Sequence, residues 1–268
     1  MVNILHNPDK HIKVFSVPEA KNVIVSGDIH GDFNLLVFKL CVQYALTDTL
    51  LIVAGDCGFG FEKRLYYDNI YMRNRERLAK ANNWIIMLRG NHDNPAYFEN
   101  EWIQYDRFRT IPDYSLVQAC GHSIFCQGGA VSIDRSHRIA QKSELRNKKY
   151  EVGEADIYWP NEMPYYDEHL FDEIKQAGNV DTVISHTAPS FCEMVSKDGL
   201  AGWACYDDTL LDDIERERDT MDATFHRLIQ DGHPLTNWFY GHFHRHWFAT
   251  IEGVDFRMLD IVEFQELR

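Results

Sequence analysis

Five apolar runs recur along the chain, and each ends in glycine and polar residues. The runs cover residues 22–27, 49–55, 84–90, 181–186 and 238–244. Short apolar runs bounded by turn-forming residues are typical of strands that are buried on both faces. The pattern therefore predicts a set of core strands, each followed by a polar turn.

Stretches with helical periodicity separate the first three of these runs. They cover residues 32–47 and 61–82, and the second is amphipathic with its charges on one face. Strands that alternate with helices indicate βαβ units and a parallel sheet. Further helices are expected at about residues 167–177 and over the acidic stretch of residues 206–230.

Other parts of the chain favour antiparallel pairing. Residues 105–133 contain short alternating runs that glycines interrupt, and residues 246–264 alternate like two closing strands. Residues 134–166 turn polar and irregular, which predicts a surface excursion, a small cap or insertion. No internal repeat or linker is evident, so residues 1–268 are expected to form a single domain of class α/β (α+β) with mixed sheets.

The composition limits the possible functions. The 268 residues are 45% hydrophobic, which is enough for a large buried core. The formal net charge of −14 repels polyanions, so long nucleic acids are not expected as partners. No apolar run approaches the roughly 18 residues of a membrane span, and the N-terminus lacks a leader pattern. Six scattered cysteines without a CxxC pair favour reduced thiols, so a cytoplasmic protein is expected, with no membrane partner.

Polar clusters stand at the end of every expected core strand. They read GDIHGD, GDCG, GNHD, SHTAP and GHFH. The carboxyl ends of parallel strands meet at one edge of a sheet, so these clusters should converge in space. The metal-ligating or catalytic side chains that they contain are Asp28, His30, Asp56, Asn91, His92, His186, His242 and His244.

This set of side chains predicts metal binding. Carboxylate and amide oxygens with imidazole nitrogens suit Mn, Fe or Zn, and the absence of thiolates argues against a structural zinc site. Eight such groups exceed the needs of one ion, whereas two divalent ions that share a carboxylate would use them and act on phosphoryl centres. The amide of Asn91 would give its oxygen to a metal while its NH₂ faces the substrate.

The five blocks, in this order between residues 27 and 244, resemble those of the calcineurin-like metallophosphoesterases. The resemblance implies a β-sandwich of mixed sheets flanked by helices. It also implies that Asp56 bridges two metals and that a metal-bridging hydroxide attacks phosphorus while His92 protonates the leaving oxygen. The remaining ligands implied are Asp28, His30 and His244 for one metal, and Asn91, His186 and His242 for the other.

The blocks GDIHGD and LRGNH are similar in part to the serine/threonine protein phosphatase branch of that family. That branch has aspartate and arginine where this chain has Phe59 and Gly60, so the phosphate clamp and the partner of the catalytic histidine do not carry over. Asp93 is an alternative partner that would hold His92. The phosphate contact has three alternatives, namely Arg89, Arg138 and Arg245.

The sequence thus predicts a two-metal hydrolase of phosphoesters, with phosphomonoesterase activity as the first hypothesis. Its partner would be a phosphorylated substrate, whether a small molecule, a nucleotide or a phosphoprotein. The alternatives are a phosphodiesterase or nucleotide hydrolase, and a non-catalytic binding scaffold with the same fold. Trp159, Tyr165 and Tyr166 either line a substrate pocket or pack the cap onto the sandwich.

Overall fold

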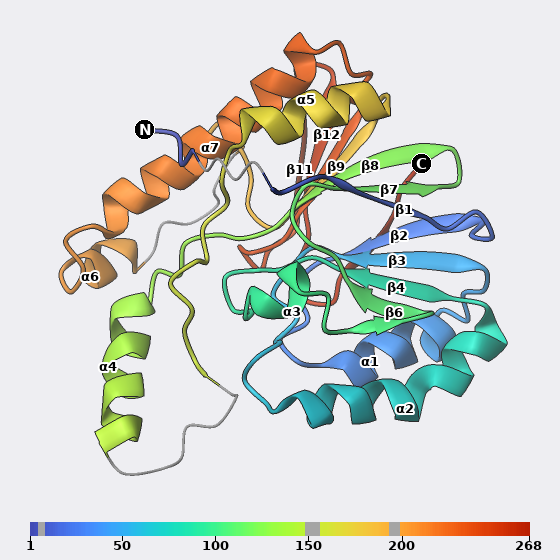
Figure 1. Cartoon of the computed structure of the whole chain (residues 1–268), viewed down its shortest axis with the longest axis horizontal. Coiled ribbons are helices and arrows are strands. Elements are labelled where there is room, and N and C mark those ends of the chain that lie inside the picture. Colours follow the sequence, from blue (N-terminus) through green and yellow to red (C-terminus); the bar gives the residue numbers. More distant parts are fainter. Residues whose placement is uncertain (5–8, 148–155, 193–198) are drawn as a thin grey trace.

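The computed structural model describes residues 1–4, 9–147, 156–192 and 199–268, and it contains two β-sheets packed face to face with helices outside them (Figure 1). One sheet has six strands. Its order is β13 (Phe264–Glu266), β2 (Asn22–Ser26), β3 (Thr49–Val53), β4 (Trp84–Met87), β6 (Phe108–Thr110) and β5 (Gln104–Tyr105). The four central strands run parallel, and both edge strands are antiparallel to their neighbours.

The second sheet has seven strands. Its order is β1 (Lys13–Ser16), β7 (Ser115–Ala119), β8 (His122–Gln127), β9 (Thr182–Ser185), β10 (Asn237–Tyr240), β12 (Val254–Met258) and β11 (Trp247–Ile251). Strands β8, β9, β10 and β12 are mutually parallel, whereas β7 and β11 pair antiparallel with β8 and β12. Both sheets are therefore mixed.

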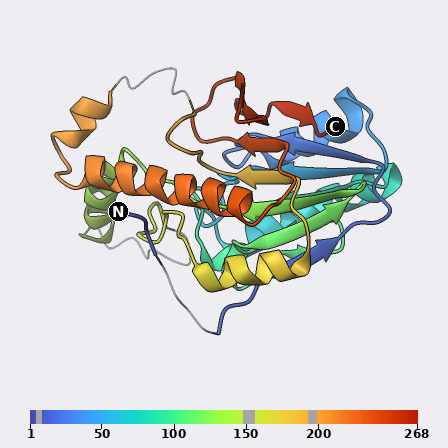
Figure 2. The same ribbon diagram turned by 90° about the horizontal axis from the view of Figure 1, so that it is seen from above.

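Helices cover the outer face of each sheet (Figures 1 and 2). The six-stranded sheet carries α1 (Phe33–Phe38), which continues as the π-helical segment η1 (Lys39–Gln43), and α2 (Arg64–Ala81). The seven-stranded sheet carries α5 (Glu168–Ala177) and α7 (Leu210–Gln230). The remaining helices are α3 (Ala96–Glu99), α4 (Arg135–Asn147) and α6 (Leu200–Ala204).

The alternation of side chains along the strands produces this layered core. In β2, Val23 and Val25 face the other sheet and meet residues such as Ile184, whereas Ile24 faces the helices and packs in the same cluster as Leu36. Both faces of the central strands are buried, which explains their uninterrupted apolar sequence. The four layers are helices, sheet, sheet and helices.

Most of the elements predicted from the sequence are confirmed, with three differences. The helix expected over residues 32–47 ends at Gln43, and β1 was not foreseen. The irregular excursion expected at residues 134–166 begins instead with the 13-residue helix α4, which lies to one side of the sheets (Figure 1). Residues 148–155 of that excursion lie outside the described residues.

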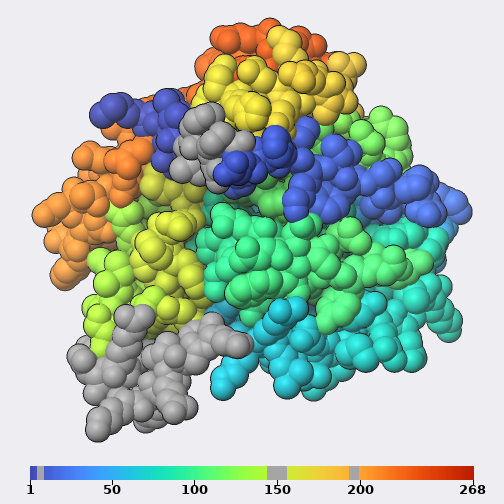
Figure 3. Space-filling model, viewed as in Figure 1, coloured from blue at the N-terminus to red at the C-terminus, as the bar shows by residue number. Residues whose placement is uncertain are grey.

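Residues 156–166 reach the surface beside α4, seen in yellow in Figure 3. Tyr165 and Tyr166 from this segment pack against the cluster under α5, so they belong to the core of the sandwich. Within the described ranges, none of the helices is both long and apolar enough to cross a membrane.

Candidate metal centre

The predicted side chains meet where the carboxyl ends of the two parallel sets of strands come together. One group consists of Asp28, His30, Asp56 and His244, whose donor atoms all lie within 4.8 Å of one another. Nε2 of His244 lies 3.0 Å from Oδ2 of Asp28 and 2.9 Å from Nε2 of His30. Imidazole nitrogens and a carboxylate oxygen that point at one place have the arrangement of ligands around an ion.

A second group adjoins the first through Asp56. Oδ1 of Asn91 lies 2.9 Å from Nε2 of His186 and 3.0 Å from Nδ1 of His242. Nε2 of His186 is in turn 3.3 Å from Oδ1 of Asp56. Asp56 therefore stands between the two groups, because its other oxygen lies 4.0 Å from Nδ1 of His30.

The two buried carboxylates of the site require compensating positive charge. The exposed fractions of Asp28 and Asp56 are only 0% and 1%, and their ionic partners in the described residues are histidines, never lysine or arginine. Buried carboxylates are costly unless a positive charge compensates them. The donor set thus fits divalent metal ions in both charge and chemistry.

The backbone at the site adopts strained conformations. His30, Asp56, His242 and His244 have φ angles of 44°, 46°, 68° and 51°, in the left-handed region that residues other than glycine rarely occupy. Such conformations persist only where the surrounding structure holds them, and they concentrate at functional sites. Hydrogen bonds between neighbouring loops supply that support here, since the amides of Ile29 and His30 both donate to the carbonyl of Asp56.

Two glycines allow the backbone to approach the carboxylates. A Cβ atom on Gly241 would lie 2.1 Å from Oδ1 of Asp28, and one on Gly90 would lie 2.0 Å from Oδ1 of Asp56. The backbone amides of His242 and His92 donate to these same oxygens, at 2.9 and 2.8 Å. Each carboxylate is therefore fixed by an amide that only a glycine neighbour can bring close enough.

The environment of His186 orients its ring. Nδ1 lies 2.7 Å from the carbonyl oxygen of Ala54, at the end of the opposite sheet, so Nδ1 carries the hydrogen and Nε2 faces the ligands. Burial lowers the pKa of His186, but the carboxylate of Asp56 outweighs it and raises the pKa to about 9. A metal that binds Nε2 must therefore displace a proton at neutral pH.

The orientation of the Asn91 amide differs from the sequence-based expectation. Its Nδ2 does not face outward but donates to Oγ of Ser132 at 2.8 Å, in the interior. Ser132 in turn donates its hydroxyl hydrogen to Oε2 of Glu162 at 2.6 Å, and its backbone amide donates to Oε1 at 3.0 Å. Because the hydroxyl hydrogen of Ser132 is already used, its oxygen can only accept from Asn91, which turns Oδ1 of Asn91 towards His186 and His242.

No pattern along the chain pointed to Ser132 and Glu162. Both are buried, and Glu162 comes from the segment that the sequence pattern described as irregular. Burial raises the pKa of Glu162 to about 7, although the hydrogen bonds that Glu162 accepts from Ser132 act to lower it. Above that pH, Glu162 is ionised and acts only as an acceptor.

Asp93 binds backbone rather than the ring of His92. Its two oxygens accept hydrogen bonds from the amides of Cys57, Gly58, Phe59 and Gly90, at 2.7 to 3.0 Å. These bonds tie the loop after β3 to the loop after β4. Asp93 therefore holds in place the two loops that carry Asp56 and Asn91.

Of the three arginines considered for phosphate binding, Arg89 is buried and occupied. Its guanidinium pairs with Asp113 at 2.8 Å and donates to the carbonyl oxygens of Asn161, Glu162 and Met163. It thereby fastens the segment that carries Glu162. Arg138 pairs with Asp134 and is closer to the surface, and Arg245 is exposed.

His92 lies at the rim of the cluster with 20% of its side chain exposed. Its Nε2 is 4.0 Å from Oδ2 of Asp56, and its ring lies edge-on to that of His30, with centroids 6.0 Å apart. Burial lowers the pKa of His92, although the nearby carboxylate of Asp56 acts to raise it. This side chain is near the ligands and also within reach of a bound molecule.

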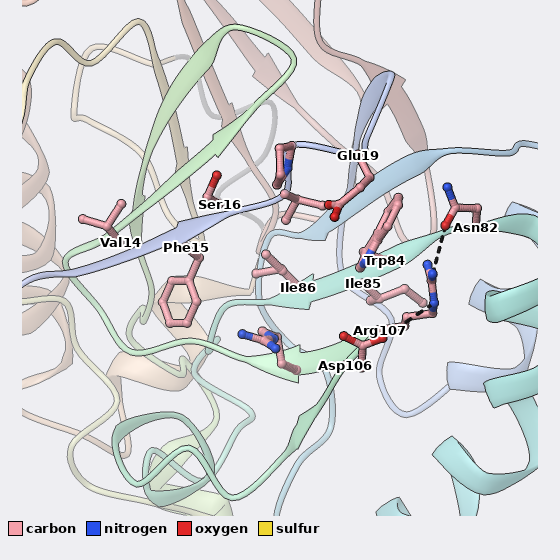
Figure 4. A pocket seen from close by; sticks show the side chains of 13 residues that line it. Val14, Phe15, Ser16, Glu19, Asn82, Trp84, Ile85, Ile86, Asp106 and Arg107 are labelled. Carbon is pink, nitrogen blue, oxygen red and sulfur yellow. Dashed lines mark hydrogen bonds and ion pairs between the residues drawn. The ribbon is translucent and has the colours of Figure 1, made fainter.

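A cavity of about 450 Å³ opens elsewhere, between β1 and the strands β4 and β6 (Figure 4). Its lining includes Phe15, Trp84 and Arg107, and none of the predicted site residues contributes to it. The centre therefore does not coincide with this cavity, as expected for a site that is open at the strand ends.

The chain is similar to known proteins in sequence pattern and in fold. The family model for calcineurin-like phosphoesterases matches residues 21–246. Among curated proteins, no sequence match is found. The crystal structure of TT1561 from Thermus thermophilus is 11% identical over 91% of each chain, with a TM-score of 0.50.

Two further structures align with lower TM-scores. A dimetal phosphatase from Danio rerio is 12% identical and aligns over 92% of this chain and 88% of its own, with a TM-score of 0.47. A phosphopantetheinyl hydrolase from Mycobacterium tuberculosis is 14% identical over 93% and 96% of the two chains, with a TM-score of 0.38. At these identities a structural likeness informs on the fold alone.

The close approach of Gly241 to Asp28 can be tested with Gly241→Ala. The added Cβ displaces the carboxylate, so we expect loss of bound metal and a lower free energy of unfolding, by about 1–3 kcal/mol. Elemental analysis and urea unfolding measure these quantities. Gly202→Ala is the matched control, because a Cβ there meets nothing within 4 Å. Equal metal content in the two variants would contradict the steric argument.

The chain of bonds behind Asn91 can be tested with Glu162→Gln, in buffer above the pKa of Glu162. The amide of Ser132 keeps the glutamine oxygen at the Oε1 position, so the glutamine NH₂ donates to Oγ of Ser132. The serine hydroxyl then donates to Asn91 and inverts its amide. We expect metal affinity to fall by roughly 10–100-fold, measured by titration with Zn²⁺ or Mn²⁺.

Glu217→Gln provides the control for this loss of charge. Glu217 is also buried and accepts from the amide of Val131 and the hydroxyl of Thr187, but neither group bonds the side chain of a ligand. Similar losses of metal affinity in Glu162→Gln and Glu217→Gln would contradict this prediction. They would show that the lost negative charge, rather than the orientation of Asn91, determines metal affinity.

Proposed function

The chain belongs to the family of calcineurin-like phosphoesterases, and from this we propose that it hydrolyses phosphomonoesters at a centre of two metal ions. Membership makes it a metal-dependent phosphoesterase. The observation that carries the finer proposal is the convergence of two donor groups on Asp56. A single ion would leave one of these groups without a function.

The two groups suggest how the ligands divide. Asp28, His30 and His244 would hold one ion, and Asn91, His186 and His242 the other, with Asp56 shared between them. Oxygen and imidazole donors without thiolates favour Mn, Fe or Zn. When bound, the ions supply positive charge for the phosphoryl oxygens and lower the pKa of a coordinated water.

His92 would act on the leaving group. It follows the ligand Asn91 directly, and its amide bond to Asp56 fixes its backbone while the ring remains partly exposed. A proton on the outward-facing nitrogen of the ring would pass to the leaving oxygen as the bond to phosphorus breaks. Its neighbour Asp93 supports this role indirectly, by holding the two loops that flank the ring.

The preference for monoesters rests on the blocks GDIHGD and LRGNH. The alternative, action on phosphodiesters or nucleotides, is favoured by the missing arginine clamp. A Cβ on Gly60 would lie 2.5 Å from Cβ of Asn94 and 2.6 Å from the ring of Trp159, so position 60 has no room for a larger side chain. Because Arg89 is buried and occupied, Arg138 and Arg245 remain as candidates to contact a phosphate at the rim.

The proposed function is tested by an activity panel on enzyme reconstituted with Mn²⁺, Fe²⁺ or Zn²⁺. We expect higher kcat/KM for p-nitrophenyl phosphate than for bis(p-nitrophenyl) phosphate, with nucleotides and phosphopeptides assayed beside them. Asp56→Asn should abolish turnover of every substrate and reduce bound metal. Faster turnover of the diester would overturn the monoesterase proposal but leave the metal centre intact.

The role of His92 can be tested through the leaving group. An alkyl phosphate leaves as a strongly basic alkoxide that needs a proton, whereas p-nitrophenolate does not. We therefore expect His92→Ala to lower kcat roughly 10²–10⁴-fold on an alkyl phosphate and much less on p-nitrophenyl phosphate. Metal content should stay unchanged. An equal loss on both substrates, or loss of metal, would assign His92 to binding instead.

A further inference from the structure

A second cluster of metal-ligating side chains lies outside the catalytic centre, on the surface of α5. It consists of His11, His169 and Glu173, whose donor atoms all lie within 4.8 Å of one another. Nδ1 of His11 is 2.6 Å and Nε2 of His169 is 3.1 Å from the same oxygen, Oε1 of Glu173. We refer to these three residues as the His11 cluster.

Two of the three donors come from one rigid element. His169 and Glu173 are four residues apart on α5, so they share one face of the helix. The first turn is capped by Asp167, whose side chain accepts a hydrogen bond from the amide of Leu170. An i, i+4 pair on a capped helix is a preformed half of a metal site.

The third donor comes from a segment that is also held in place. The amide of Ile12 donates to Oε2 of Glu173 at 2.9 Å, and its side chain packs against the core cluster beneath α5. β1 begins at the next residue, Lys13. Figure 2 shows this N-terminal chain, in blue, running past α5. Oε2 is therefore occupied, which directs Oε1 towards both imidazoles.

The charge at Glu173 is not met by a basic side chain. Its described partners are the two histidines and the amide of Ile12, with no lysine or arginine within ion-pair distance among the described residues. Neutral imidazoles are the form in which histidine binds metals, and they leave the carboxylate charge uncompensated. A divalent cation would supply the missing charge.

We propose that the His11 cluster binds one borderline divalent transition metal ion, of the Zn²⁺ class, with water completing its coordination. In a tetrahedral zinc site the donors lie about 3.3 Å apart, given bonds of about 2.0–2.2 Å. The two nitrogen–oxygen distances to Oε1 of Glu173, 2.6 and 3.1 Å, would need only a small increase to reach that value. Two imidazoles disfavour Mg²⁺ and Ca²⁺, which prefer oxygen ligands. The ion would fasten residues 9–12 to α5, a structural role separate from catalysis.

The chain offers a matched control for this proposal. His246 forms an equivalent contact with Glu263, in which Nδ1 lies 2.6 Å from Oε1, and its side chain is 63% exposed against 68% for His11. No second imidazole joins that pair among the described residues. His246→Ala therefore removes a similar histidine and carboxylate pair without touching a three-donor cluster.

The experiment compares full-length wild type with His11→Ala, His169→Ala and His246→Ala after removal of metal, loading with Zn²⁺ and desalting. Elemental analysis should give one zinc ion per chain fewer in His11→Ala and His169→Ala than in the wild type, and no change in His246→Ala. The catalytic centre contributes equally to all four proteins, so the difference does not depend on its occupancy. Equal zinc content in all four would overturn the proposal.

A spectroscopic measurement gives an independent outcome. Electron paramagnetic resonance of the Cu²⁺-loaded wild type should contain a signal with nitrogen couplings that His169→Ala lacks and His246→Ala keeps. Thermal unfolding of the metal-free proteins verifies that each variant folds. Copper held by the histidines of the catalytic centre gives a signal common to all variants, so the comparison uses the difference between spectra. Spectra of His11→Ala and His169→Ala that match that of the wild type would reject the His11 cluster as a site.

Discussion

The structure depends on placing two aspartates, Asp28 and Asp56, out of contact with water at the seam between its two sheets. Neither has a lysine or arginine partner within the described residues, so the fold tolerates them only through histidines, donated amides and the cations that the site attracts. The surrounding features follow from this requirement. Glycines bring amides to the carboxylates, the backbones of four proposed ligands adopt left-handed angles, and Asp93 binds the adjoining loops together.

The sequence predicted which side chains gather at the proposed metal centre, because each of them follows a strand whose apolar pattern is clear. The residues that support the ligands carried no such signal. The role of Ser132 and Glu162 is evident only from the hydrogen bonds that link them to Asn91. Likewise, Arg89 donates to a segment that lies 72 to 74 residues away in the chain. Helix α4 escaped detection because the residues from Arg135 onward are mostly polar and offer no apolar stripe of helical period.

Phe59 and Gly60, which depart from the protein phosphatase pattern, are both part of the packed interior beside the site. Phe59 is fully buried, and its ring stacks on Tyr97 and contacts Phe33 and Tyr67. Gly60 uses both its backbone groups, accepting from the amide of Asp156 and donating to the hydroxyl of Tyr67. A packed aromatic cluster therefore occupies the place where that branch has charged residues, and the segment after residue 155 lies against it.

The spread of the ligands along the chain also governs when the centre can exist. His30 meets His244 across 214 residues, and the amide of His242 reaches Asp28 across the same separation. Contacts this distant form late, because the loop they close is long. During synthesis, the chain through His244 must leave the ribosome before His242 and His244 can contact Asp28. Until then the carboxylate of Asp28 lacks the amide of His242 and the imidazole of His244 that contact it in the folded protein.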